Sequence, residues 1–296
     1  MIFVSPEVRQ ALDTGRPVVA LESTLIAHGL PYPVNLEVAR ESEAAVRASG
    51  AVPATVAIID GVPTVGITSA QLEALATGKN ILKVSRRDLG VAIARKQLAA
   101  TTVSGTLAIA AEVGIKVFAT GGIGGAHRPP ANAWDISADI SEIARSKMLT
   151  VCAGAKNLLD LPRTLELLES AGVPVLGYRT DTFPEFYTRG GTLPVSARVD
   201  HRSEVASIYL AQMFFGTGTL LCQPLAAEDA IDPEEFRAAL QVAEALAQAQ
   251  GVKGARLTPF LLAQLADLTE GRTLVANRKL IVNNARLAGE VAAVLP

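Results

Sequence analysis

Short apolar runs rich in Val and Ile alternate with longer segments whose apolar residues recur at helical spacing, along nearly the whole chain. This alternation is typical of strands that are connected by helices, an arrangement that produces a mostly parallel sheet. The clearest expected strands cover residues 17–22, 54–60, 81–85, 116–120, 150–154, 173–178 and 218–222. The sequence therefore predicts an α/β fold.

Polar N-caps and first-turn prolines indicate where the connecting helices begin. They are Asn35 for a helix ending near Gly50, Ser69 for one ending near Gly78, and Asp232 with Pro233 for a long amphipathic helix. The spacing of apolar residues predicts two more helices within residues 258–295.

No internal repeat, low-complexity tract or linker rich in Gly, Ser or Pro divides the sequence. We therefore expect residues 1–296 to form a single domain. The stretch 186–200 lacks helical and strand periodicity and contains polar residues and glycines. Such stretches are typical of functional surface loops, so a lid is expected here.

Charge and cysteine content exclude several classes of protein. The 27 basic and 29 acidic side chains give a net charge of −2, whereas nucleic-acid binders normally carry a clustered basic excess, so no nucleic-acid partner is expected. Cys152 and Cys222 lie in apolar runs and offer no disulfide framework, which indicates a reduced, cytoplasmic setting. No stretch reaches the roughly 18 apolar residues of a membrane helix, so no membrane partner is expected either.

Glu22 is the first candidate for chemistry, because it directly follows the apolar strand 17–22 and precedes Ser23, Thr24 and His28. In a parallel sheet, ligands bind where the carboxyl ends of the strands meet. Desolvation at the edge of a core raises the pKa of a carboxyl group and prepares it to act as a general acid. The alternative is a structural carboxylate that is bonded to backbone amides.

Lys156 lies in a strand-to-helix turn after Cys152-Ala-Gly-Ala, among small and apolar neighbours. An amine that is partly removed from water loses its proton more readily and can attack an aldehyde or masked aldehyde to form a Schiff base. A solvated surface lysine or a phosphate contact is the alternative interpretation.

Lys83 and the run 85–88 place three cations at the start of a helix, which resembles an anion site. Lys83 would act as a point charge and Ser85 as a hydroxyl donor. The competing interpretation is a Ser85-x-x-Asp88 cap with both arginines solvated. The segment 101–105, which contains Val103, offers a second helix start whose backbone amides could face a ligand.

The run GGIGGAHRPP superficially resembles a dinucleotide-binding fingerprint. Pro129 and Pro130 stand where the helix of that fingerprint should begin, and no phosphate loop of the GxxxxGK[ST] type occurs in the sequence. We therefore expect no nucleotide cofactor. The glycines more plausibly allow the backbone to approach a ligand closely, with His127 as a polar contact.

Asp135 and Asp139 flank Ser137 in the segment WDISADI. Ser137 or Asp139 could simply cap the following helix. Alternatively, one carboxylate could hold Mg²⁺ or Mn²⁺ that keeps most of its water, because hard cations prefer oxygen ligands. Structural zinc is disfavoured, since the two cysteines are far apart and the sequence has only three histidines.

Taken together, the motifs closely resemble those of the pseudouridine-5′-phosphate glycosidases over nearly the whole chain. They are ALESTLIAHGLPYP (20–33), KVSRRDL (83–89), TTVSGT (101–106), FATGGIGGAHR (118–128), WDISADI (134–140), VCAGAKNLLDLPRTLELLE (151–169) and NNARLA (283–288). The resemblance implies a three-layer α/β/α sandwich with a mostly parallel central sheet. It also implies reversible cleavage of the C–C glycosidic bond of pseudouridine 5′-phosphate to uracil and ribose 5-phosphate.

The same resemblance implies one Mn²⁺ per subunit, mostly held by water, and a homotrimer. Carried over position by position, it makes Glu22 the proton donor, Lys156 the covalent nucleophile and Asp135 the metal ligand. The substrate contacts that it implies are Lys83, the backbone at Val103, and Ser137, Ala138 and Asp139.

Two departures from the family pattern concern recognition of the base. Gln223 stands before Pro224 where an Asn is expected, and the loop 188–197 matches only loosely. Asn277, Asn283 and Asn284 are candidate base contacts among which the sequence does not choose. Two other functions stay open: a Schiff-base lyase acting on another sugar phosphate, and a non-catalytic sugar-phosphate sensor.

Overall fold

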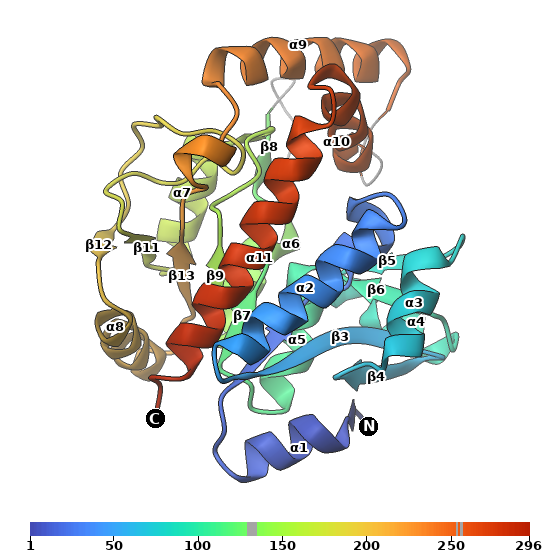
Figure 1. Ribbon diagram of the computed structural model, residues 1–296, viewed down its shortest axis with the longest axis vertical. Helices are drawn as coiled ribbons and strands as arrows, with labels where there is room; N and C mark the ends of the chain where they lie inside the picture. Colours follow the sequence, from blue (N-terminus) through green and yellow to red (C-terminus); the bar gives the residue numbers. More distant parts are fainter. Residues whose placement is uncertain (129–134, 253, 255–256) are drawn as a thin grey trace.

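The computed structural model describes residues 1–128, 135–252, 254 and 257–296, and it shows an α/β fold in which helices cover both faces of a mostly parallel sheet (Figure 1). The main sheet has 11 strands in the order β1-β4-β3-β2-β7-β9-β13-β11-β12, and β6 joins β5 to β3. Its strands are β1 (Phe3–Val4), β2 (Val18–Leu21), β3 (Val52–Ile59), β4 (Val62–Val65), β5 (Leu82–Val84), β6 (Ala99–Thr101), β7 (Val117–Ala119), β9 (Leu149–Cys152), β11 (Val175–Tyr178), β12 (Ala197–Val199) and β13 (Thr219–Cys222). A separate pair consists of β8 (Ala126–His127) and β10 (Leu159–Asp160).

Most of the described helices cover the two faces of the sheet, whereas α9 (Pro233–Ala249) and α10 (Leu257–Leu268) lie at its upper end in Figure 1. The other helices are α1 (Pro6–Asp13), α2 (Val34–Ala48), α3 (Ser69–Thr77), α4 (Leu89–Ala94), α5 (Val103–Glu112), α6 (Ala138–Ser146), α7 (Leu161–Ser170), α8 (Arg202–Phe214) and α11 (Arg272–Ala292). Three short turns of other helix types are η1 (Leu25–Gly29), η2 (Arg86–Asp88) and η3 (Ala227–Asp229). Helices α2 and α11 lie side by side across the front of the sheet, and α5 lies behind it (Figure 1).

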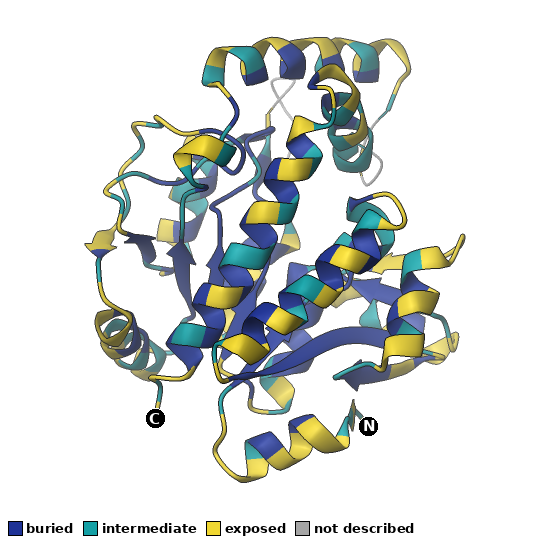
Figure 2. Cartoon of the chain, in the orientation of Figure 1, coloured by how far each residue is buried: buried dark blue, intermediate teal, exposed yellow. Residues whose placement is uncertain are grey.

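Alternation along the central strands explains why both faces need helices. In β2, Val18 and Ala20 belong to one hydrophobic cluster, whereas Val19 and Leu21 belong to another on the opposite face. Successive side chains of a strand point to opposite faces, so a strand that is apolar throughout must be covered on both. Figure 2 shows the result: the central strands are buried, and α2 and α11 alternate buried and exposed residues. The expected three-layer α/β/α sandwich is confirmed.

The expected strands are each present within a few residues of their predicted limits, and α10 and α11 are the two helices expected in 258–295. Two predicted caps are wrong. Asn35 lies inside α2, because its buried amide donates instead to the carbonyls of Ile26 (2.7 Å) and Ala76 (3.0 Å). The cap of α3 is Thr68, which forms a capping box with Gln71, and Ser69 is the first helical residue.

The structure also shows the state of the two cysteines and whether any helix could span a membrane. Cys152 and Cys222 are free and buried on paired neighbouring strands, with their sulfur atoms 3.8 Å apart. Among the residues that the structure describes, no helix is long and apolar enough to cross a membrane.

Asn284 ties α11 to the loop after β7. Its amide donates to the carbonyls of Thr120 (2.9 Å) and Gly121 (3.2 Å), and its side chain is buried. Replacing Asn284 by Ala removes the hydrogen bonds to both carbonyls, and only Gly121 keeps another donor, the Ala153 amide. We therefore expect the free energy of unfolding to fall by about 2 kcal/mol in urea titrations.

The neighbouring Asn283→Ala is the matched control for this prediction. The Asn283 side chain accepts only an exposed hydrogen bond from Arg286, so the free energy of unfolding should change by less than about 0.5 kcal/mol. Equal losses of stability in the two variants would contradict the assigned role of Asn284.

Candidate functional site

The catalytic, metal-binding and sugar-phosphate residues predicted from sequence line one cavity of about 440 Å³. They are Glu22, Lys83, Val103, Asp135, Ser137, Ala138, Asp139 and Lys156. They come from five separate segments of the chain, so their convergence is a property of the fold and not of local sequence. The structure thus places these side chains together, while their individual roles remain predictions.

The elements reach this cavity from two directions. Strands β2, β7 and β9 are parallel neighbours, and their carboxyl ends deliver Glu22 and Lys156. Strands β5 and β6 approach differently, because β6 pairs antiparallel with the second half of the long strand β3. Thr101 at the end of β6 binds the Ser23 hydroxyl through its amide (2.9 Å) and the Val56 carbonyl through its hydroxyl (2.8 Å). This pairing brings Lys83 back to the edge that holds Glu22.

Glu22 is half-buried, and burial raises the pKa of its carboxyl group. The positive charge of Lys156, a hydrogen bond from the Thr120 hydroxyl and the charge of Lys83 lower this pKa, whereas the charge of Asp139 raises it. The net direction is upward, so the protonated form persists to a higher pH than for a solvated glutamate. Glu22 is therefore better suited than a solvated glutamate to act as a proton donor.

Lys156 is held by backbone contacts to the glycine-rich loop. The amide of Lys156 donates to the Ile123 carbonyl (3.3 Å), and the amide of Ala153 donates to the Gly121 carbonyl (2.9 Å). Between them Gly154 has φ +80°, and a Cβ there would lie 1.9 Å from the Pro184 carbonyl oxygen, so only glycine fits. The turn therefore fixes the direction in which the lysine leaves the backbone, toward the cavity that also holds Glu22.

The positive charge of Lys156 affects two neighbouring basic groups, Lys83 and His127. The cavity walls displace water from the Lys83 ammonium and lower its pKa, and the charge of Lys156 lowers it further. Burial also lowers the pKa of His127, with Asp135 acting in the opposite direction. Lys83, His127 and Lys156 therefore act on one another electrostatically, which places all three near the centre of the site.

Asp139 binds backbone groups from two segments of the cavity wall. Its Oδ1 accepts from the Ser104 amide (3.0 Å) at the start of α5, and its Oδ2 accepts from the Gly124 amide (2.9 Å). Ser137 is the N-cap of α6 and accepts from the Asp139 amide (3.2 Å), so the capping interpretation of Ser137 is confirmed. Asp139 is buried and shapes the cavity through these amides, and its direct contact with a substrate stays a prediction.

The glycine run after β7 serves close packing. A Cβ at Gly124 would lie 2.4 Å from the Ser137 hydroxyl, and one at Gly125 would lie 2.3 Å from the Thr164 hydroxyl. The short strand β8 follows this loop, and a helix does not begin there. The glycines thus permit close packing against Ser137 and Thr164, and the close approach to a ligand expected from the sequence stays a prediction. Pro129 and Pro130 themselves lie outside the described residues.

A second, smaller cavity of about 60 Å³ adjoins the first and shares Glu22, Lys83 and Lys156 with it. Its other walls are more apolar and include Leu25, Phe186, Pro259, Leu262 and Ile281. Asn277 also lines it, whereas Asn284 is used by backbone carbonyls and Asn283 pairs with Arg286. The structure thus singles out Asn277 among the three asparagines.

Phe186 was not recognised as a site residue from the sequence. It has φ +57°, and its ring occupies the space where a Cβ on Gly122 would lie, at 2.6 Å. Its amide donates to the Ala153 carbonyl (3.1 Å), which ties it to the turn of Lys156. No local pattern predicts this conformation, because it is imposed by packing between distant segments.

Asp135 is exposed at the wall of the larger cavity, where its carbonyl accepts from the His127 amide (2.9 Å). Among the residues that the structure describes, no group of three or more His, Cys, Asp or Glu side chains could enclose a metal ion. A single accessible carboxylate does fit a hard divalent cation that keeps most of its water ligands. The donor set is compatible with loosely held Mn²⁺ or Mg²⁺ and not with a closed metal cage.

Residues 7–294 match the family model described as indigoidine synthase A like protein. The chain belongs to this family. Family relatives include pseudouridine-5′-phosphate glycosidase from Herpetosiphon aurantiacus, which is 50% identical over 296 residues, with 99% of this chain and 98% of the relative covered. The enzyme of the same name from Chloroflexus aurantiacus is 51% identical over 298 residues, with 99% and 98% covered.

Solved structures of family relatives share the fold. The prealnumycin C-glycosynthase AlnA, in complex with ribulose 5-phosphate, superposes with a TM-score of 0.92 at 43% identity, covering 100% of this chain and 97% of AlnA. An indigoidine synthase A-like protein from Thermotoga maritima superposes with a TM-score of 0.88 at 33% identity, covering 99% and 96%. The family fold thus extends over the whole cavity and its walls.

Proposed function

We propose that this protein is a pseudouridine-5′-phosphate glycosidase, which reversibly cleaves the C–C glycosidic bond to give uracil and ribose 5-phosphate. The observation that carries the proposal is the meeting of the Glu22 carboxyl and the Lys156 amine in one cavity. Curated relatives with this name are about half identical over the full length. A relative named as a C-glycosynthase was solved with a sugar phosphate bound, which supports the same substrate class.

The two groups provide a route for breaking a carbon–carbon bond that has no lone pair to protonate. The neutral amine of Lys156 attacks C1′ of the ribose, the bond from C1′ to the ring oxygen breaks, and Glu22 protonates that oxygen. The Glu22 carboxylate then takes a proton from the adduct nitrogen, whose freed lone pair forms a C1′=N bond while the C1′–C5 bond breaks, and Glu22 returns that proton to C5 of uracil. Water hydrolyses the resulting Schiff base to ribose 5-phosphate and restores the amine.

The two adjoining cavities match the two halves of the substrate. The larger, more polar cavity would take the ribose 5-phosphate, and the smaller one, with Phe186 and Asn277, would take uracil. Glu22 and Lys156 line both cavities, so they stand at the boundary where the scissile bond would lie. Lys83, Val103, Ser137, Ala138 and Asp139 are proposed to hold the sugar phosphate on their side of that boundary.

Release of uracil tests this function directly. Pseudouridine 5′-phosphate should be consumed with the absorbance change of base release, and uracil and ribose 5-phosphate should appear in equal amounts. Turnover of a different sugar phosphate without base release would instead indicate a Schiff-base lyase. Tight binding of ribose 5-phosphate without any turnover would indicate a sensor, and either result would overturn the proposal.

Asp135 is proposed to hold one Mn²⁺ per subunit, with water as the other ligands. When bound, the ion supplies positive charge beside the sugar phosphate. Asp135→Asn should weaken Mn²⁺ binding by at least about 10-fold, as measured by electron paramagnetic resonance of free Mn²⁺. In parallel, the chelator-sensitive part of the activity should disappear. Unchanged Mn²⁺ affinity in this variant would place the ion elsewhere.

We further propose that residues 1–296 form one domain, which assembles as a homotrimer in the cytoplasm. The C-terminal helix α11 packs on β2, β7 and β9 and on α2, so both ends of the chain contribute to one core. Light scattering coupled to size-exclusion chromatography gives the number of subunits directly.

A further inference from the structure

The two consecutive arginines of η2 point in different directions. Arg86 reaches away from the cavity to α6, where its guanidinium donates to Glu142 (2.6 Å). Arg87 lines the 440 Å³ cavity, and its side chain is 87% exposed. Of the two competing sequence interpretations, the Ser85–Asp88 cap is confirmed, although Arg86 is paired with Glu142 and is not solvated, and the anion site stays a prediction.

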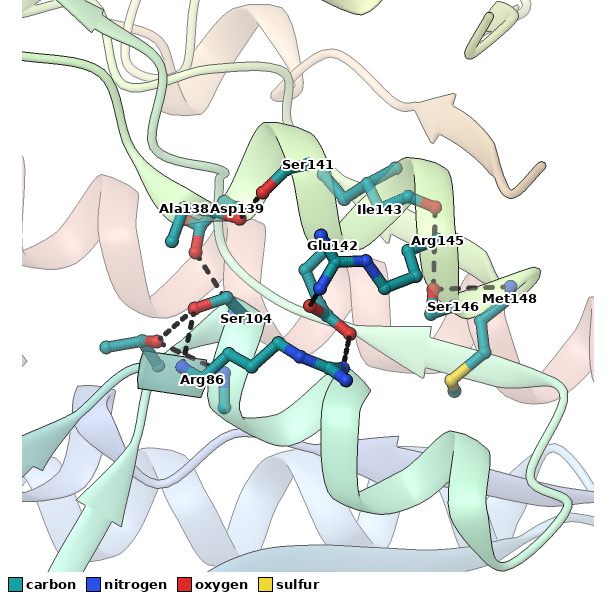
Figure 3. Close-up of polar contacts among 12 residues, drawn as sticks. Arg86, Ser104, Ala138, Asp139, Ser141, Glu142, Ile143, Arg145, Ser146 and Met148 are labelled. Carbon is teal, nitrogen blue, oxygen red and sulfur yellow. Dashed lines mark hydrogen bonds and ion pairs between the residues drawn. The ribbon is translucent and has the colours of Figure 1, made fainter. Parts of the chain in front are cut away.

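Glu142 anchors Arg86 firmly. Its carboxyl is 2% exposed, and Arg145 approaches its other oxygen only to 3.8 Å. The Arg86 amide also donates to the Ser104 hydroxyl (3.4 Å), so both ends of Arg86 are fixed (Figure 3). A buried carboxylate that loses its partner is costly, so this pair holds η2 in one orientation against α5 and α6.

Arg87, by contrast, has only a weak local partner. Its guanidinium lies 3.5 Å from the neighbouring Asp88 carboxylate in an exposed pair, which contributes little. Among the described residues that line this cavity, Arg87 is the one arginine. A guanidinium offers a planar pair of donors that matches two oxygens of a phosphate.

The position of Arg87 suits the phosphate better than the reacting carbon. Lys83 lines both cavities, and its charge changes the pKa values of Glu22, His28 and His127. Lys83 therefore lies near the centre of the site, close to the reacting carbon. Arg87 lies with Asp88 and with Ser85, the N-cap of η2. All three line the larger cavity and are absent from the described lining of the smaller one. The 5′-phosphate is at the opposite end of the ribose from C1′, which is where a second cation is needed.

We propose that Arg87 binds the 5′-phosphate of the substrate and that the Arg86–Glu142 pair positions it by turning Arg87 toward the cavity. Arg87 is then a specificity-determining residue for phosphorylated over unphosphorylated substrate, and Glu142 is a positioning residue. The identity of the substrate rests on the proposed function, whereas the recognition of a sugar phosphate does not.

Two kinetic variants test the proposal. Arg87→Gln should raise KM for pseudouridine 5′-phosphate by about 10- to 100-fold, the loss expected for a charge-assisted pair, with kcat changed by less than about threefold. For unphosphorylated pseudouridine, kcat/KM should stay within about twofold. Glu142→Gln should also reduce the preference for phosphorylated over unphosphorylated substrate, by a smaller factor than Arg87→Gln. Arg87→Lys should keep part of that preference.

Arg145→Gln is the matched control, since it removes an exposed arginine beside the same Glu142 carboxylate without touching η2. It should leave the preference for phosphorylated substrate unchanged. An equal loss in Arg145→Gln, or an unchanged KM in Arg87→Gln, would overturn the proposal. A Glu142→Gln variant that melts earlier but keeps the full preference would show a purely structural role for the pair.

Calorimetric titration with ribose 5-phosphate separates this proposal from the proposed function. Wild-type protein should bind ribose 5-phosphate, and Arg87→Gln should bind it about 10-fold or more weakly, even if pseudouridine 5′-phosphate proves not to be cleaved. Equal affinity in the two proteins, or no binding to wild type, would refute the role of Arg87 whatever the reaction is.

Discussion

Replacing Lys156 by Ala is expected to lower kcat for uracil release by at least about 10⁴-fold, within the range found when the nucleophile of a covalent enzyme is removed. The reason is chemical, because the proposed route needs an amine that forms a double bond to C1′ as the carbon–carbon bond breaks. No other described group that lines both cavities can form a Schiff base except Lys83. Steady-state assays of uracil release give the factor.

Two further variants show whether the loss is specific to Lys156. Lys79→Ala removes an exposed lysine outside both cavities and should keep full activity. Lys83→Ala should lose activity but still form a covalent adduct at Lys156, since Lys83 is assigned to substrate binding. Activity near that of wild type in Lys156→Ala would remove the nucleophile from the scheme, and an adduct on Lys83 would reassign it.

Glu22→Gln is expected to lower kcat by about 10²- to 10⁴-fold, the usual contribution of a general acid. The dependence of the reaction rate on pH should also report the protonation of Glu22. Because burial raises the pKa of Glu22, the active, protonated form is present below that raised pKa and is lost as the pH increases through it. The wild-type rate should therefore fall along an alkaline limb above the ordinary range of a glutamate, and Glu22→Gln should lack this limb.

A substitution at Thr120 tests the assignment of the alkaline limb to Glu22, because it should move that limb in a known direction. Its hydroxyl donates to the Glu22 carboxylate and so lowers the Glu22 pKa. Thr120→Val removes that donor, and the alkaline limb should move to higher pH. A shift to lower pH, or a limb that persists in Glu22→Gln, would assign the titration to another group.

Local patterns predicted the sheet strands and the candidates Glu22 and Lys156, whereas the roles expected of the other cavity residues came from the family resemblance. A strand that is buried on both faces is expected to be mostly apolar, and this holds for β2, β9 and β13, in which Thr150 and Thr219 are the only polar residues. Glu22 comes directly after β2, and Lys156 follows β9 after the three small residues 153–155. Their position relative to the sheet edge could therefore be predicted without tertiary information.

Features that depend on distant contacts could not be predicted in this way. Asn35 has the residue type of a cap, but carbonyls from η1 and α3 bind its amide, so tertiary contacts override the local preference. The antiparallel pairing of β6 with β3 depends on segments about 40 residues apart and leaves no local signal.

The two arginines of η2 are an example at the site of a difference that local sequence could not predict. Spacing alone makes Arg86 and Arg87 equivalent, and only the buried Glu142 on α6 distinguishes them. Phe186 is a second case, since its positive φ is set by packing on Gly122. Residues of this kind become visible only when segments from different parts of the chain are brought together.

The central claim is that the amine of Lys156 bonds to a carbon of the sugar. Wild-type protein is incubated with ribose 5-phosphate or pseudouridine 5′-phosphate, reduced with borohydride, digested and mapped by mass spectrometry. The account predicts a reduced ribose-phosphate adduct on the peptide that contains Lys156, and no such adduct in Lys156→Ala. An adduct on a different residue, or none while uracil is being released, would contradict it.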